Sequence, residues 1–212
     1  QAEDGIRDRS PSRGLGDVYK RQLKGQVEVD ETYLALSDRH ARAVAKPRKS
    51  NTSKALVAIA VETLQPHGFG RIRLRRIEND AAESVIPFVQ ASVEPGAQVR
   101  TDGSAAYRSL SHLGYDHQKS VMLGSDIPAH QSMPGVHRVA SLVKRWILGT
   151  HHGAVQPEHL DAYLDEFVFR FNRRTSRSRG MLFYRLLQQA MATEPVTYSD
   201  VVSTLSKTKK SR

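Results

Sequence analysis

Residues 25–36 read GQVEVDETYLAL, and this stretch decides the fold class. Its valines alternate with polar residues, which predicts a strand with one apolar face. Asp30 then lies on the polar face, beside Glu28 and Thr32. An aspartate in the middle of a strand is unfavourable on β propensity alone, so its presence needs a reason. Either it is a solvent-exposed carboxylate on an edge strand, which is the usual case, or it belongs to a functional site.

The segments that follow predict further strands of a sheet. Residues 37–53 are polar and basic and predict a loop. Residues 55–61, ALVAIAV, are continuously apolar and predict a strand that is buried on both faces. Residues 69–77 alternate apolar side chains with arginines and predict a strand with one basic face. Three successive strands with short connections favour an antiparallel meander.

A helix and another strand are predicted after the meander. Asp80 and Glu83 form a capping-box pattern at the start of a helix that ends before Pro95. Residues 97–102, AQVRTD, predict a strand that stops at Gly103. A helix between two strands implies a crossover and parallel pairing with an earlier strand. The predicted class is therefore α/β, and the order resembles the ribonuclease H-like fold, a mixed sheet of an antiparallel meander plus parallel strands, flanked by helices.

In that fold the first and fourth strands are neighbours, so we expect Asp30 and Asp102 to face each other. Two carboxylates so close repel each other unless a cation lies between them. A pair of divalent ions, Mg²⁺ or Mn²⁺, roughly 3.5 to 4 Å apart, relieves this repulsion and suits chemistry at phosphorus. Gly103 directly follows Asp102 and lets a nucleic-acid backbone approach closely.

The composition favours a polyanionic partner. The chain has 212 residues, with 32 Lys and Arg against 22 Asp and Glu, and a net charge of +10. This excess comes without an amphipathic anchor or a long apolar run, so nucleic acid is favoured and no membrane partner is expected. The chain has no cysteine, which excludes disulfides, thiol catalysis and Cys-based zinc sites within these residues. No secretory or transmembrane segment is visible, so the cytoplasm is the expected compartment.

Four motifs occur in order along the chain. They are VEVDETYL around Asp30, RTDGSAAY around Asp102, GVHRVASLVKRWILGTHHG, and HLDAYLDEFVFRFNRR. Together they resemble the catalytic region of ISXO2-like insertion-sequence transposases, a group related to the Mutator-like and DDE transposases, over residues 25–187. The resemblance implies an enzyme that cuts the 3′ ends of an element with water and joins the exposed 3′-OH to target DNA. It also implies a metal site whose ligands are two aspartates and, as the third residue, Glu or Asn. A Lys or Arg follows this third residue.

Carried onto this chain, the resemblance implies that Asp30 and Asp102 are metal ligands and catalytic residues. The third position falls on His137, 35 residues after Asp102 (137 minus 102), where relatives usually have Asn or Glu. His137 is then either a third metal ligand, with a preference for Mn²⁺, or a proton shuttle beside the site. Lys144 lies two helical turns further on the same helix face and is expected to hold a phosphate near the metals.

A helix predicted after Pro157 carries an apolar face that we assign to core packing. Glu166 or Asp165 on this helix is the alternative third ligand. The end of this helix, the basic loop and the helix of Lys144 carry clustered positive charges, which predict contacts with DNA phosphates or else a merely solvated surface. The predicted nucleic-acid-binding residues are Lys46, Arg48, Lys49, Lys144, Arg145, Arg173 and Arg174.

The domain organisation follows from these patterns. Residues 23–192 are predicted to form the catalytic domain, which a helix over residues 181–191 closes, and residues 193–212 form a basic tail. Residues 1–22 resemble a translated sequencing-adapter stretch, the alternative being a disordered basic arm, and we do not expect them to fold. We therefore expect the natural chain to begin upstream of Leu23. The resemblance implies a Cys-rich, zinc-binding recognition segment there, so this chain is expected to bind DNA weakly or nonspecifically.

DNA is the predicted partner, both as element ends and as target. Full-length transposases of this kind act as multimers that bridge two element ends, so the resemblance allows a homo-oligomer, although no sequence feature marks an interface. Two other interpretations stay open. The first is a catalytically inactive DNA-binding remnant, which the departure at His137 favours. The second is a ribonuclease H-like nuclease that cuts DNA without joining it.

Overall fold

The computed structural model describes residues 22–37, 52–64, 66, 68–120, 132–152 and 155–191. The chain divides into two compact units, and residues 22–174 form one of them. In the other unit, the described part contains α7 (Arg179–Met191), which confirms the helix expected near the end of the chain. The sheet and the candidate site belong to residues 22–174.

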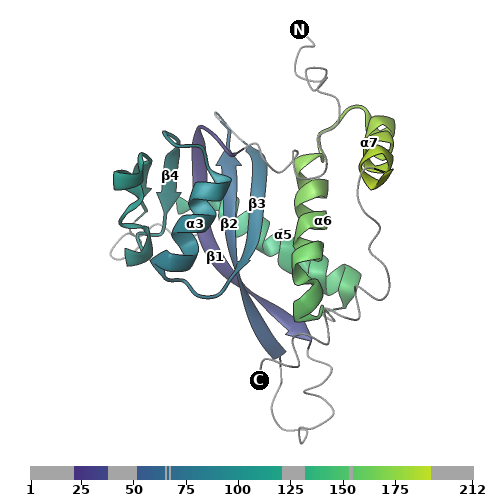
Figure 1. Ribbon diagram of the computed structural model, residues 1–212, viewed down its shortest axis with the longest axis horizontal. Coiled ribbons are helices and arrows are strands. Elements are labelled where there is room, and N and C mark those ends of the chain that lie inside the picture. Colours follow the sequence, from purple (N-terminus) through teal and green to yellow (C-terminus); the bar gives the residue numbers. More distant parts are fainter. Residues whose placement is uncertain are drawn as a thin grey trace, which may run out of the picture. The chain divides into compact units, whose positions relative to one another are not determined.

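Five strands form one mixed sheet in the order β3-β2-β1-β4-β5 (Figure 1). β1 (Gln26–Ser37), β2 (Thr52–Thr63) and β3 (Phe69–Ile77) pair antiparallel in chain order. β4 (Gln98–Thr101) pairs parallel with β1, and β5 (Asp116–Lys119) pairs parallel with β4. The predicted meander and the predicted parallel addition are both confirmed.

The burial of the strands follows their sequence patterns. In β2, every residue from Leu56 to Val61 exposes 7% or less of its surface, as expected for a continuously apolar strand with β1 and β3 on either side. In β1, Val27 and Val29 are buried in the hydrophobic core, whereas Asp30 is only half-buried. Asp30 therefore lies on a central strand, so the edge-strand explanation for this aspartate is wrong.

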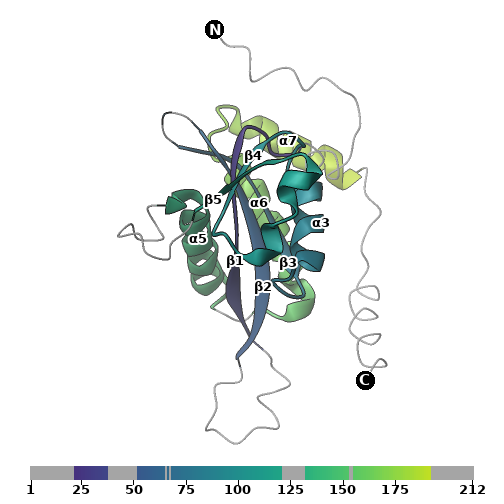
Figure 2. The same cartoon turned by 90° about the vertical axis from the view of Figure 1, so that its left-hand side faces the viewer.

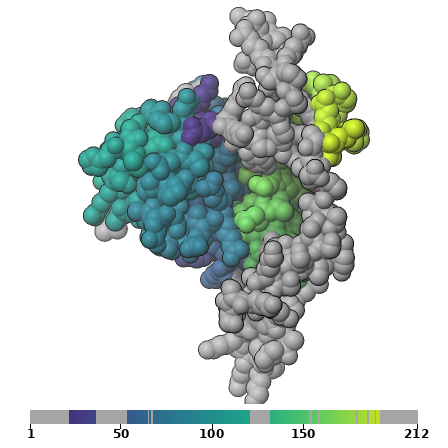
Figure 3. All heavy atoms as spheres, in the orientation of Figure 1, coloured from purple at the N-terminus to yellow at the C-terminus, as the bar shows by residue number. Residues whose placement is uncertain are grey.

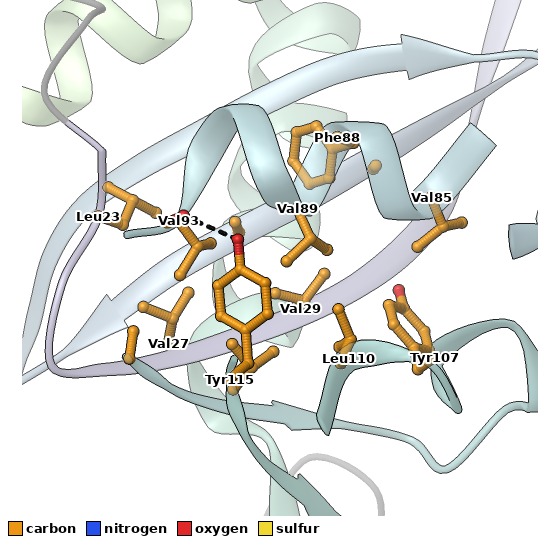
Figure 4. Packing of buried hydrophobic residues seen from close by; sticks show 14 of the residues in the cluster. Leu23, Val27, Val29, Val85, Phe88, Val89, Val93, Tyr107, Leu110 and Tyr115 are labelled. Atoms are coloured by element: carbon orange, nitrogen blue, oxygen red, sulfur yellow. Dashed lines mark hydrogen bonds between the residues drawn. The ribbon is translucent and has the colours of Figure 1, made fainter. Parts of the chain in front are cut away.

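One face of the sheet carries the main hydrophobic core. α3 (Ala82–Ser92) covers this face together with the short 3-10 helices η1 (Ala105–Tyr107) and η2 (Leu110–Leu113) (Figures 1 and 3). Figure 4 shows side chains of β1 and α3 meeting those of the segment after β4. The labelled core residues are Leu23, Val27, Val29, Val85, Phe88, Val89, Val93, Tyr107, Leu110 and Tyr115.

The start of α3 differs from the predicted capping box at Asp80. The N-cap residue is Ala81, and its side chain makes no capping hydrogen bond. Just before the helix, Asn79 Oδ1 accepts from the Ala81 N–H at 3.1 Å, and Asn79 Nδ2 donates to Glu83 Oε1 at 2.9 Å. An amide can accept and donate at once, whereas an ionised aspartate only accepts. The predicted capping box at Asp80 is therefore wrong, because the helix begins after Ala81 and Glu83 bonds to Asn79.

The opposite face of the sheet is covered by α5 (Pro134–His151) and α6 (Leu160–Asn172) (Figure 2). α5 contacts β1 and β2, and α6 contacts β3. Pro157 begins a 3-10 turn, η3 (Pro157–His159), that leads into α6. The buried residues of these helices are Gly135, Val136, Val139, Val143 and Ile147 in α5, and Leu160, Leu164, Phe167 and Val168 in α6.

The end of α6 binds the outer edge of the sheet. Asn172 Oδ1 accepts from the Ile72 N–H at 2.8 Å, and Asn172 Nδ2 donates to the Ile72 carbonyl at 3.2 Å. Arg174 donates to the carbonyls of Phe69 and Gly70. An edge strand presents unpaired backbone groups, and these side chains satisfy several of those in β3. The mixed sheet with helices on both faces is a ribonuclease H-like α/β fold, as predicted.

Candidate active site

Two adjacent parallel strands bring Asp30 and Asp102 to the same place. The β1–β4 register pairs Glu28 with Arg100, and each aspartate lies two residues further along the chain. Asp102 follows β4 directly, where the chain leaves the sheet. The charge of Asp102 acts on Asp30, so the two carboxylates are electrostatic neighbours. The structure thus brings together the two aspartates that the sequence analysis singled out.

The surroundings of Asp30 disfavour its negative charge. Burial raises the pKa of the Asp30 carboxyl, and the charge of Asp102 raises it further. A hydrogen bond from the Glu31 N–H to Asp30 Oδ1, at 2.8 Å, and the neighbouring His137 act in the opposite direction. The net shift is upward. A cation bound between the aspartates would relieve this unfavourable charge.

A tight turn fixes the position of Asp102. Its Oδ1 accepts from the Ser104 N–H at 2.9 Å, and Gly103 has a φ of +87°, a conformation that glycine adopts readily. Thr101, just before it, is fully buried, and its hydroxyl accepts from the Gly103 N–H at 3.3 Å and lies 3.0 Å from His117 Nε2. Strand β5 therefore supports the turn that carries Asp102, through His117.

α5 supplies the opposite wall of a cavity of about 500 Å³. His137 and Lys144 both line this cavity, so the expectation that they share one face of a helix is confirmed. Asp30 lines it from β1, whereas Asp102 is not among its lining residues. The lining consists of Asp30, Glu31, Thr32, Ile59, Val136, His137, Ala140, Ser141 and Lys144.

The aspartates of the site meet part of what a metal ion requires. Within the described ranges, no three His, Cys, Asp or Glu side chains are grouped so that they could hold a metal ion. A third-ligand role for His137 therefore remains a prediction. Mg²⁺ often binds proteins through one or two carboxylates and completes its shell with waters and substrate phosphates. Asp30 and Asp102, anionic and mutually repelling, fit that mode.

Glu28 has a clear structural partner that the sequence patterns did not reveal. It is 2% exposed, and its Oε2 accepts from the N–H groups of Gly135 at 2.7 Å and Val136 at 3.0 Å. These are first-turn amides of α5, directly before His137. Burial raises the pKa of Glu28, while the two backbone hydrogen bonds counteract that shift. The only local feature of the sequence that indicated a role for Glu28 is its position two residues before Asp30, on the polar face of β1.

Glu31 and Tyr107 form a second unpredicted pair beside the aspartates. The Tyr107 hydroxyl donates to Glu31 Oε1, and Tyr107 is itself fully buried. Burial raises the pKa of Glu31 to about 7, helped by the charges of Asp30 and Asp102 and opposed by the Tyr107 hydrogen bond. Burial and the Glu31 carboxylate also raise the pKa of Tyr107, so its hydroxyl stays a donor. This edge of the cavity is rich in carboxylates.

The basic residues proposed to bind DNA have different surroundings. Arg145 and Lys144 are exposed on α5. The guanidinium of Arg173 lies 4.1 Å from the ring centre of Phe169, and that of Arg174 lies 4.0 Å from the ring centre of Phe171. Lys46, Arg48 and Lys49 lie outside the described residues. A DNA-binding role for all of these residues stays a prediction.

The alternative third ligands on α6 and the two histidines at the end of α5 do not line this cavity. Glu166, an alternative third ligand, forms an ion pair with Arg170 at 2.7 Å, and neither it nor Asp165 lines the cavity. His151 lies against the aromatic rings of Trp146 and Tyr163, with ring centres 4.9 and 4.2 Å away. His152 follows at the left-handed C-cap of α5, so the two neighbouring histidines occupy different surroundings.

The fold and the paired aspartates place the chain among the ribonuclease H-like domains. Within that class, the family of the ISXO2-like transposase domain matches residues 22–172, which is most of the chain. The chain belongs to this family, and the family supports a transposase role with DNA as the partner. No protein of curated function matches the chain. None of the helices in the described ranges is long and apolar enough to cross a membrane.

Proposed function

We propose that this domain cleaves the 3′ ends of an insertion sequence and transfers them to target DNA with the help of divalent cations. The observation that carries the proposal is the meeting of Asp30 and Asp102 at neighbouring strands, with His137 on the facing helix. The unfavourable charge at Asp30 supports a cation-dependent site. Membership in the transposase family supports the reaction class.

Each residue has a role that its position allows. Asp30 and Asp102 would hold Mg²⁺ or Mn²⁺, two ions in the full site, which activate the attacking water or 3′-OH and stabilise the leaving oxygen. Lys144 lies on the cavity wall and can bind a non-bridging phosphate oxygen. His137 faces Asp30 and either completes the coordination or exchanges a proton with the attacking or leaving group.

The DNA is proposed to approach along α5. Arg145 and Lys144 are exposed there, next to the cavity, and lysine and arginine contacts with phosphates supply the nonspecific part of DNA binding. Arg173 is proposed as a further DNA contact, and so are Lys46, Arg48 and Lys49, which lie outside the described residues. A homo-oligomer that bridges two element ends is proposed on the family resemblance alone.

The first experiment is a Mn²⁺ titration followed by thermal unfolding of the full chain, beside Asp30→Asn and Asp102→Asn. Ligand binding to the folded state raises the unfolding temperature. We expect the wild type to gain stability and both variants to lose that gain. DNA carrying the element ends is then incubated with Mn²⁺ to look for cleaved and joined products. An equal response of wild type and variants to Mn²⁺ would show that the two aspartates do not form a metal site.

A second candidate function is DNA binding without catalysis. It is favoured by the finding that, in the part of the chain that the structure describes, no three potential ligands are grouped for a metal. This alternative predicts DNA binding that survives Asp30→Ala and no cleavage by the wild type. A nuclease of the same fold would instead yield cleaved products but no joined ones.

A further inference from the structure

The first turn of α5 is not capped by the side chain of its own N-cap residue. Met133 occupies the N-cap position and makes no side-chain hydrogen bond to the helix. The first amides of a helix have no partner within it, and they need one when they are buried. Here Glu28 Oε2 accepts from two of them, Gly135 N–H at 2.7 Å and Val136 N–H at 3.0 Å. The helix is therefore capped across the fold by a carboxylate of β1, 107 residues before Gly135.

The absence of a side chain at Gly135 leaves room for the contact between Glu28 and α5. A Cβ atom on Gly135 would lie 2.8 Å from Glu28 Oε2, 3.2 Å from Val61 Cγ1 and 3.3 Å from Phe69 Cδ1. Each of these distances is shorter than an ordinary van der Waals contact. Glycine thus lets the first turn of α5 lie directly on the sheet. By contrast, a Cβ on Gly149, near the other end of α5, would meet nothing within 4 Å.

The residue after this anchored turn is His137. Glu28 and Asp30 lie on the same face of β1, and Asp30 lines the cavity opposite His137. One strand therefore holds both the carboxylate that faces His137 and the carboxylate that anchors its helix. A displacement of the first turn by about 1 Å is enough to lower a reaction rate about 100-fold when the displaced group takes part in it.

We propose that Glu28 is a positioning residue of the active site: its hydrogen bonds to Gly135 and Val136 hold His137 opposite Asp30. The consequence for catalysis rests on the proposed function. The Glu28 carboxylate also lies at the N-terminus of α5, where the helix dipole is positive. This favours a carboxylate over a neutral side chain at this contact.

Two pairs of substitutions separate positioning from simple stability. Glu28→Gln keeps an oxygen acceptor of the same shape, whereas Glu28→Met removes it. Gly135→Ala disturbs the same contact without changing Glu28, and Gly149→Ala is its matched control on the same helix. Glu62→Gln is the stability control, because Glu62 is another buried carboxylate of the sheet and does not line the cavity.

The first measurement reports the position of His137 without reference to activity. The NMR signals of the His137 ring are recorded at one pH, with and without Asp30→Asn, in each background. We expect Asp30→Asn to shift these signals in the wild type, in Glu28→Gln and in Gly149→Ala. We expect that shift to be lost in Glu28→Met and in Gly135→Ala. An unchanged shift in folded Gly135→Ala and Glu28→Met would overturn the proposal.

The second measurement is the cleavage rate at saturating DNA, together with the Kd for DNA. We expect Glu28→Met and Gly135→Ala to lower the rate about 10- to 100-fold with little change in Kd. Glu28→Gln should retain most of the rate, and Gly149→Ala and Glu62→Gln should match the wild type at temperatures where they are folded. If Glu28→Met cleaves DNA at the wild-type rate, the positioning role is refuted and the proposed function stays intact. An inactive wild type that still shows the His137 coupling refutes the proposed function alone.

Discussion

Two carboxylate regions of the same sheet differ in how their charge is compensated. Glu62 of β2 is 7% exposed, and its carboxylate accepts from the guanidinium of Arg71 at 2.6 Å and from the N–H groups of Arg71 and Lys24. Burial raises the pKa of Glu62, but these hydrogen bonds outweigh it, so the net pKa lies below its usual value. The protein itself supplies the cation that this region needs.

In the region around Asp30, no comparable guanidinium among the described residues is hydrogen-bonded to the carboxylates of Asp30 and Glu31. Glu31 accepts a hydrogen bond from the neutral hydroxyl of Tyr107, and the nearest charges include the carboxylates of Asp30 and Asp102. Burial and these charges raise the pKa of Glu31 to about 7. Burial alone therefore does not distinguish a structural carboxylate from a functional one. The compensating partner does, and at Asp30 we propose that the partner is a cation from solution.

The largest expected effect is the loss of catalysis in Asp30→Asn and Asp102→Asn. Cleavage with Mn²⁺ should fall about 1000-fold or more, because each change removes an anionic ligand from the proposed metal site. In EDTA, however, each variant should be as stable as the wild type or more stable by about 0.5 to 1 kcal/mol, since one of two repelling charges is gone. Activity assays and chemical unfolding measure the two halves of this prediction.

Asparagine is the suitable replacement for both aspartates. Asp30 Oδ1 accepts from the Glu31 N–H, and Asp102 Oδ1 accepts from the Ser104 N–H. At each position, the side-chain oxygen of asparagine can accept the same bond. A destabilised Asp30→Asn in EDTA would contradict the comparison, because it would mean that the charge of Asp30 is already compensated within the protein.

Glu62→Gln should have the opposite effect on stability. An amide group placed among the donors of Arg71 and Lys24 turns one hydrogen bond into a repulsion, so we expect a loss of about 2 to 3 kcal/mol at pH 7. The folded-state pKa of Glu62 is lowered, so its contribution is present above about pH 4.5, the unfolded value, and is lost as the pH falls through the folded pKa. The difference between wild type and variant should therefore shrink below pH 4.5. Urea unfolding at pH 7 and at pH 3.5 tests this, and an equal difference at both values would argue against the ion pair.

The sheet and the pairing of Asp30 with Asp102 were predictable because their signals are local. Residues 55–61 are continuously apolar, and the alternation of β1 is visible within a few residues. The strand–helix–strand order then favours a parallel pairing, which places the two aspartates side by side. The hydrogen bonds of Asn79 before α3, in place of a capping box at Asp80, show the limit of such patterns, since neighbouring polar residues differ in which hydrogen bonds they can make.

The contacts made across the fold were not predictable in this way. The bond from Gly135 to Glu28 depends on which helix end packs against β1, and no local pattern around either residue specifies that. Similarly, Asn172 and Arg174 look like part of a basic surface cluster, yet both bind the backbone of β3. That role arises because β3 is an edge strand, a fact set by the order of the whole sheet.

Tyr107→Phe should have a smaller effect near the site. The change removes the hydroxyl that donates to Glu31 and leaves an oxygen of this half-buried carboxylate without that partner. We expect a loss of about 1 kcal/mol of unfolding free energy in EDTA, since the ring itself still fills its place in the core. Thermal unfolding measures it, with Tyr33→Phe as the control, because the Tyr33 side chain is largely exposed. A loss no larger than that of the control would show that Glu31 does not depend on this donor.

The smallest effects should separate structural arginines from functional ones. Arg145 is exposed on α5, next in the chain to the cavity-lining Lys144, so Arg145→Gln should leave stability unchanged. It should weaken DNA binding a few-fold and lower the slope of log Kd against log salt by about 1. Arg174 donates to the carbonyls of Phe69, Gly70 and Phe171, so Arg174→Gln should instead cost about 1 kcal/mol of stability. Fluorescence anisotropy over a range of salt, with urea unfolding alongside, measures both. The opposite result, in which Arg174→Gln weakens DNA binding and Arg145→Gln lowers stability, would contradict this assignment. It would mean that an arginine bound to the backbone of β3 also binds DNA.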